Sequence, residues 1–182
     1  MQRFIQSNVL KSRAFVRTMQ SSAGVVNKGS CHCGTVHFEA KGDPSFAVQC
    51  HCSVCRRCHS ASYAPLVGFA PQNLKITKGE SNLVKYTTGK EDRFSCKTCG
   101  SKVFSELNHL KHRAVFTPNF SWGGVDSKGY PPKFRPAAHI FYGSGTVSVY
   151  DGLPKFETMP KAYGGDDKQL PEDHHDKRAP KA

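Results

Sequence analysis

The spacing of eight cysteines constrains this chain more than any other feature of its sequence. Seven fall into short pairs or triplets within three stretches, GSCHCG at residues 29–34, QCHCSVCRRCH at 49–59 and CKTCGS at 96–101. Gaps of one or two residues suit thiolate ligands of a metal ion better than well-shaped disulfides. The N-terminus also lacks the uninterrupted apolar segment of a secretory signal. We therefore expect reduced cysteines that bind metal in an intracellular compartment.

The first and third stretches together predict one closed site. The two-residue gap in CKTCG lets Cys96 and Cys99 point at one centre, and Gly100 lets the chain leave that turn with positive φ. Two ligands do not complete a tetrahedral zinc site, and Cys31 and Cys33 supply the second pair. We predict a structural zinc ion here, whose binding would contribute to folding.

The second stretch predicts a site of a different kind. Cys50, Cys52 and Cys55 follow the pattern C-x-C-x-x-C. Three thiolates leave one position on a zinc ion for water or substrate, as catalytic zinc requires, so we expect this second zinc to be the catalytic one. Cys58 either closes the site as a fourth ligand or stays beside it as a free thiol. His51 and His59 either compete as ligands or lie partly exposed next to the site.

Further candidates for substrate contacts are weaker, because each has an ordinary structural alternative. Arg56 and Arg57 either lower thiol pKa values and attract a carboxylate or simply face solvent. The other cationic candidates are Lys75 and Arg93. Aromatic residues that either wall a pocket or fill the core are Phe69, Phe104, Phe116 and Trp122. Candidate proton carriers are His109, His112 and His139.

Short strand patterns separated by Gly, Pro, Asn and Asp recur through the middle of the chain, whereas no segment keeps a helical apolar period for three turns. The body is therefore predicted to be mainly β, with one short helical turn at 53–60. Residues 119–136, rich in Gly and Pro, are predicted to form a loop that either covers the site or crosses the surface.

Both ends of the chain are set apart from this body. Residues 1–28 hold five basic and no acidic residues and project as an amphipathic helix, which predicts either a mitochondrial transit peptide or a disordered leader. Residues 161–182 are polar and of mixed charge, and are predicted to be disordered, with His174 and His175 in solvent. The predicted domain is thus 29–160, in the mitochondrial matrix or, without transit, the cytosol.

The formal net charge is +12, but part of it belongs to the leader. A mildly basic body attracts anionic small molecules and binds nucleic acid only weakly, so no nucleic-acid partner is expected. No apolar run reaches the roughly 20 residues of a membrane helix. The expected partners are small molecules, and the sequence does not indicate an oligomeric state.

The order GSCHCG, CHCSVC and CKTCGS, followed by HIFY and DGLPKFE, resembles the glutathione-dependent formaldehyde-activating enzyme family, whose domain also occurs in centromere protein V. The resemblance runs from about Gly29 to Pro160. It implies an Mss4-like β fold with two Zn²⁺ per chain, one held by the four-cysteine set and one by Cys50, Cys52 and Cys55. Cys58 lies outside that ligand pattern.

The implied activity is that of a carbon–sulfur lyase, which joins glutathione or another thiol to a small aldehyde and gives S-hydroxymethylglutathione when the aldehyde is formaldehyde. A zinc ion with an open position suits this chemistry, since it can hold an incoming thiol as thiolate. The alternative is a non-catalytic two-zinc binding module similar to the centromere protein V domain.

Overall fold

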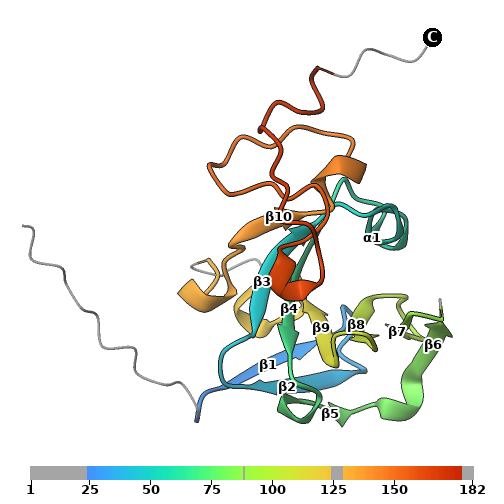
Figure 1. Ribbon diagram of the computed structural model, residues 1–182. Helices are drawn as coiled ribbons and strands as arrows, with labels where there is room; N and C mark the ends of the chain where they lie inside the picture. Colours follow the sequence, from blue (N-terminus) through green and yellow to red (C-terminus); the bar gives the residue numbers. More distant parts are fainter. Residues whose placement is uncertain (1–23, 88, 124–128, 178–182) are drawn as a thin grey trace, which may run out of the picture.

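The structure is a computed structural model that describes residues 24–87, 89–123 and 129–177. Its strands form two sheets (Figure 1). The small sheet has the order β1 (Val26–Ser30), β2 (His37–Lys41), β5 (Leu74–Lys78). The large sheet has the order β10 (Ala138–Ile140), β3 (Phe46–Cys50), β4 (Ala64–Phe69), β9 (His112–Phe116), β8 (Lys102–Leu107), β7 (Glu91–Cys96), β6 (Leu83–Thr87).

All neighbouring strands are antiparallel except β10, which pairs with β3 in parallel. The α-helix α1 (Ser53–His59) follows β3. Short 3₁₀ turns occupy Pro71–Asn73, Glu80–Asn82, Thr117–Asn119, Ser121–Gly123, Pro132–Phe134, Tyr142–Ser144 and Lys161–Tyr163. The mainly β class and short antiparallel strands predicted from the sequence are confirmed. No helix in the described ranges is long and apolar enough to cross a membrane.

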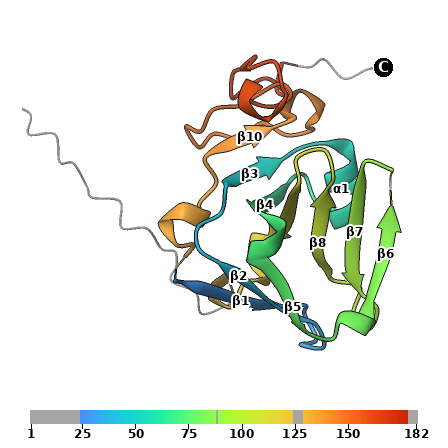
Figure 2. The ribbon, with the colours of Figure 1, turned by 60° about the horizontal axis from the view of Figure 1, so that its bottom comes forward.

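Alternating side chains of the large sheet build two separate apolar clusters, because successive residues of a strand point to opposite faces. One face packs against the small sheet (Figure 2), where Val67 of β4 and Val115 of β9 meet Phe38 of β2. On the opposite face, Leu66 of β4 and Phe116 of β9 join a second cluster. This second cluster includes Cys50 and Cys55. The fold thus buries the predicted three-cysteine site on the face that the small sheet leaves free.

The segment predicted as a loop at 119–136 is part of the core over its described residues. The Phe120 ring packs edge-on against Phe38, with centroids 5.2 Å apart, and against Phe134 at 5.3 Å. Trp122 stacks on Phe120 at 4.9 Å. These aromatic side chains anchor the segment to the cluster between the sheets, so its described part does not act as a cover for the three cysteines.

The predicted domain boundaries differ from the structure at both ends. The first strand begins at Val26, three residues before the expected start at residue 29. Residues 1–23, which carry most of the predicted leader, lie outside the described residues. The tail expected to be disordered is instead packed over 161–177, where Glu172 reaches Lys155 and His175 is buried. Figure 1 shows this orange and red C-terminal part gathered over β10 and β3.

Candidate metal centres and the cavity between strands

The four cysteines of the predicted closed site meet where two turns face each other. Cys31 and Cys33 follow β1, and Cys96 and Cys99 bracket the turn between β7 and β8. Their four sulfur atoms lie within 4.8 Å of one another. Gly100 has a φ of 74°, the positive value expected for the exit from this turn. The structure therefore brings together the four residues that the spacing grouped.

The distances within this cluster fit a tetrahedral zinc ion. Zinc–sulfur bonds of about 2.3 Å place tetrahedral sulfur ligands roughly 3.8 Å apart. The Cys33 Sγ atom lies 3.6 Å from Cys31 Sγ and 3.8 Å from Cys96 Sγ. The Val36 N–H and the Asn82 Nδ2 group each donate to a cluster sulfur at 3.3 Å, as suits thiolates. Four sulfurs complete the coordination, so this cluster is suited to a closed site.

The second cluster forms where β3 ends and α1 begins. Cys50 is the last residue of β3, Cys52 caps the N-terminus of α1, and Cys55 lies in its first turn. The Cys55 N–H donates to Cys52 Sγ at 3.3 Å, so the helix cap itself positions two of the three sulfurs. The three Sγ atoms lie within 4.8 Å of one another, and Cys58 is outside this group.

Without a cation these three sulfurs cannot all be ionised easily. The pKa of Cys52 is lowered to about 2, because first Cys50 and then Cys55 hydrogen-bonds to its thiolate. The pKa of Cys50 is raised by the same contact with Cys52, then by Cys55 and by burial. A bound cation would let all three be thiolates together, as metal ligands must be.

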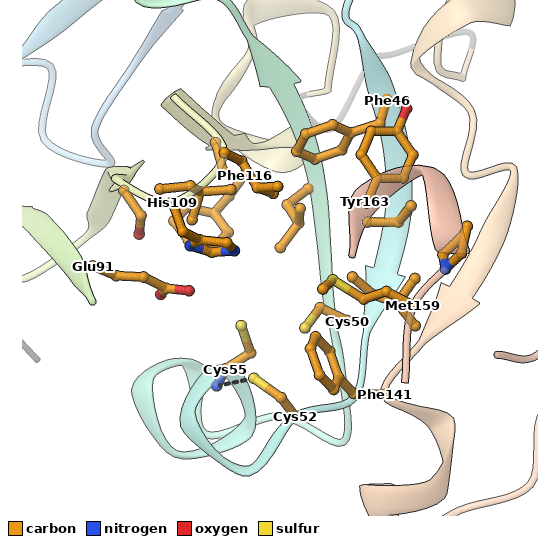
Figure 3. A pocket seen from close by; sticks show the side chains of 18 of the residues that line it. Phe46, Cys50, Cys52, Cys55, Glu91, His109, Phe116, Phe141, Met159 and Tyr163 are labelled. Atoms are coloured by element: carbon orange, nitrogen blue, oxygen red, sulfur yellow. Dashed lines mark hydrogen bonds between the residues drawn. The ribbon is translucent and has the colours of Figure 1, made fainter. Parts of the chain in front are cut away.

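A cavity of about 120 Å³ opens beside the three cysteines. Figure 3 shows their sulfurs at one end of it, with Phe46 and Tyr163 on the opposite side. Most of its wall is aliphatic or aromatic, including Leu66, Ala114 and Phe116 from the second cluster. A three-sulfur site that faces a cavity has room for a further ligand.

Two backbone features shape this wall. Phe46 lies opposite Gly68 across β3 and β4, and a Cβ on Gly68 would come within 2.1 Å of the Phe46 ring. Phe141, directly after β10, has a φ of 53°, an unfavourable value for a bulky side chain, and is held by a 2.5 Å hydrogen bond from its N–H to the Thr158 carbonyl. Strain of this kind concentrates at functional sites.

The polar part of the wall comes mainly from β7 and the β8–β9 turn. Arg93 is buried, with 5% of its surface exposed, and forms an ion pair with Glu91. Its Nε atom has no hydrogen-bond partner among the described residues. Burial by itself would lower the pKa of Arg93, but the negative charges of Glu91 and of the nearby Cys55 raise it above its usual value. His109 and Ser105 also line the cavity.

Behind the three cysteines lies a buried polar chain that the sequence patterns did not reveal. His51 Nε2 lies 2.8 Å from His139 Nδ1, and His139 Nε2 lies 2.8 Å from Asp151 Oδ2. Lys155 pairs with Asp151 and with Glu172, the latter at 2.8 Å. The one sequence signal for these buried polar residues was the family resemblance of the segments HIFY and DGLPKFE. These segments contain His139, Asp151 and Lys155.

Both inner members of this polar chain are buried histidines whose pKa values are lowered. His51 and His139 are almost completely buried, which corrects the expectation that His51 would be partly exposed. Burial lowers the pKa of His51 to about 3, and the neighbouring His139 contributes to the same shift. Burial also lowers the pKa of His139. His51 lies between Cys50 and Cys52 in the sequence. The hydrogen bonds of the His51–His139–Asp151 chain therefore fix the backbone that carries these two cysteines.

The remaining sequence candidates divide between this region and the rest of the fold. Arg56 donates to the carbonyls of His51 at 3.1 Å and Ser144 at 2.9 Å, and so braces α1. Arg57 and Lys75 are exposed and do not line the cavity. Those that line the cavity are Arg93, Phe116 and His109. Those that do not are Phe69, Phe104, Trp122, His112, His139 and His59.

The fold and its two cysteine clusters define a β protein with two sites that could hold metal ions. Residues 26–144 match the family described as glutathione-dependent formaldehyde-activating enzyme. The chain belongs to this family. A crystal structure of a Rhodobacter sphaeroides protein is 26% identical, with 58% of this chain and 91% of that chain covered and a TM-score of 0.45.

Proposed function

We propose that this protein is a zinc-dependent enzyme that joins a thiol to a small aldehyde, or cleaves the adduct, at Cys50, Cys52 and Cys55. The observation that carries the proposal is the arrangement of three sulfurs at the wall of a cavity, with Cys58 outside the group. A closed structural site would have its fourth ligand in place, as the four-cysteine cluster has.

The reaction is balanced without any further reagent. The thiol sulfur bonds to the carbonyl carbon, the carbon–oxygen π bond breaks, and the thiol proton ends on the oxygen. The reverse reaction is that of a carbon–sulfur lyase. A zinc ion held by the three cysteines would keep an incoming thiol deprotonated at neutral pH.

The protein's own residues would supply position and exclude water. The apolar wall holds the reactants together at the sulfur cluster, which removes part of the entropic cost of their encounter. His109 lines the cavity and is partly in solvent, so it is the candidate to pass a proton between the nascent hydroxyl and water. The His51–His139–Asp151 chain would keep the sulfurs in place and take no part in proton transfer.

The experiment is an optical titration of the full chain loaded with Co²⁺, with 2-mercaptoethanol as the thiol. We expect a saturable change in the sulfur-to-metal and d–d bands, with two metal ions retained per chain by mass spectrometry. Cys52→Ser should abolish this change, whereas the matched variant Cys58→Ser should keep it.

Two results would contradict the proposal. A spectrum that already shows two four-sulfur sites and does not respond to thiol would make the second site closed. The protein would then be a two-zinc binding module. Loss of the response in Cys58→Ser would show that Cys58, and not the three-cysteine set alone, governs the site.

A further inference from the structure

We propose that the thiol is apolar, with a body of about benzene's size, and that glutathione is a poor substrate. This inference rests on the proposed function and specifies its substrate class. The wall of the cavity, its volume and its charges each lead to it.

The wall favours an apolar ligand. Phe46 and Leu66 come from β3 and β4, and Phe116 from β9, so the large sheet supplies an apolar floor. Ile140 and Phe141 extend this floor next to the cysteines. Transfer of an apolar group from water to such a surface is favourable, whereas a polar group loses hydrogen bonds there.

The size of the cavity sets the size of that group. A cavity of roughly 150 Å³ lined by aliphatic and aromatic side chains binds benzene. The volume here, about 120 Å³, is comparable. It is well below the roughly 300–1,000 Å³ typical of sites for drug-sized ligands. A compact aryl or branched alkyl group would fill it, whereas a tripeptide would have to remain largely outside.

The charges disfavour glutathione, which carries two carboxylates. Among the described residues that line the cavity, Arg93 is the one side chain with a fixed positive charge. That charge is already paired with Glu91. A substrate carboxylate would therefore approach the Glu91 carboxylate, and the unpartnered Nε group of Arg93 would repay only part of its desolvation.

Part of this wall comes from outside the family match, which ends at residue 144. Met159, Pro160 and Tyr163 line the cavity from the C-terminal segment. The Tyr163 ring packs against Phe46 with centroids 5.7 Å apart, and its hydroxyl donates to the Ser45 carbonyl at 3.3 Å. This segment therefore restricts the cavity that the large sheet begins, and Met159 becomes a residue that determines specificity.

The test compares three thiols on the Co²⁺-loaded full chain: phenylmethanethiol, 2-mercaptoethanol and glutathione. We expect phenylmethanethiol to bind at least tenfold more tightly than either of the others. Met159→Gln keeps the length of the side chain but makes it polar, and should weaken phenylmethanethiol severalfold more than it weakens 2-mercaptoethanol. Val84→Gln makes the same kind of change at an exposed position of β6 and should alter neither.

Toluene, which has the same apolar body without the sulfur, separates the two proposals. Its binding, followed by calorimetry, should be detectable in the wild type and weaker in Met159→Gln. Leu110→Gln, at another half-buried position of the wall, provides a second variant if Met159→Gln does not fold.

Each outcome decides a specific claim. If 2-mercaptoethanol changes the spectrum but glutathione binds as tightly as phenylmethanethiol, the substrate class is wrong and the proposed function stands. If no thiol changes the spectrum, the proposed function is wrong, and the apolar thiol with it, even where toluene binds. Equal effects of Met159→Gln and Val84→Gln would remove Met159 from the substrate site.

Discussion

The two cysteine clusters use the same ligand atom in opposite structural settings. The four-cysteine cluster joins two turns that are distant in the sequence, and its fourth sulfur completes the coordination. The three-cysteine cluster is local, formed by the end of β3 and the first turn of α1, and faces a cavity. The number of sulfurs and the space beside them, more than the residue type, therefore separate a cluster with four ligands from one with room for a further ligand.

The largest expected effect comes from opening the closed cluster. Cys96→Ser removes one of four ligands from a site that holds β1 to the β7–β8 turn, so we expect loss of cooperative folding or a steep drop in the thermal midpoint. Cys52→Ser should keep a cooperative transition, because its cluster lies within one strand–helix junction. Thermal unfolding with metal analysis measures both. Equal unfolding of the two variants would break the division between the clusters.

A smaller loss of stability is expected when the His51–His139–Asp151 chain behind the three-cysteine cluster is disturbed. Lys155→Met removes a cation with 1% of its side chain exposed, while the carboxylates of Asp151 and Glu172 remain partly in solvent. Because those carboxylates can regain water, we expect a loss of about 2 kcal/mol in unfolding free energy, less than for a fully buried pair. Chemical denaturation measures it.

The variant Lys155→Met should also affect the two cysteine clusters differently. We expect metal to be lost more readily from the three-cysteine cluster and no more readily from the four-cysteine cluster, since the chain reaches the former through His139 and His51. Exchange with a coloured chelator would resolve the two metal ions. Faster loss of metal from the four-cysteine cluster would contradict this account. The control is Lys85→Met, which removes an exposed lysine of β6 and should change metal loss from neither cluster.

Gly68→Ala tests the wall of the cavity. The added Cβ would lie 2.1 Å from the Phe46 ring, so the ring must move into the cavity or the strands must separate. We expect a cost of about 1–3 kcal/mol, as for other overpacked sites. Thiol titration should weaken for the open cluster, and denaturation should report the cost. A wild-type response to phenylmethanethiol would show that Phe46 does not define the cavity.

The smallest effect is expected at Cys58. It lies on α1, outside the three-sulfur group, and is only partly buried. Cys58→Ser should change the unfolding free energy by no more than about 0.5 kcal/mol and leave two metal ions per chain. Mass spectrometry under native conditions is the measurement, and a stoichiometry of one metal ion would remove the distinction between open and closed clusters.

The sequence predicted those features that depend on short spacing. Cysteines two or three residues apart can bind one ion, and Gly100 permits the turn that follows such a pair. The need for four ligands then joined the two distant pairs, whereas spacing left the position of Cys58 open. Alternating strands such as β2 likewise indicated the mainly β class. The cavity could not be predicted, because Phe46, Leu66 and Tyr163 meet only through sheet order and the return of the C-terminal segment.

The error at 161–177 has a physical cause. Polarity and mixed charge normally indicate disorder, since little apolar surface can be buried. Here the segment is held by hydrogen bonds and ion pairs to partners earlier in the chain: Glu172 to Lys155, and the Tyr142 hydroxyl to the Glu172 carbonyl at 2.7 Å. Composition records the charges of such a segment but not where their partners lie.

The sequence separation of the two clusters has a consequence for biosynthesis. The three-cysteine cluster spans residues 50–55 and is complete soon after Cys55 leaves the ribosome, whereas the four-cysteine cluster must wait for Cys99. Domains form as the chain emerges, and contacts across long loops form late. We expect the nascent chain to acquire its first metal at the three-cysteine end of the future cavity, and the ion of the four-cysteine cluster to arrive last.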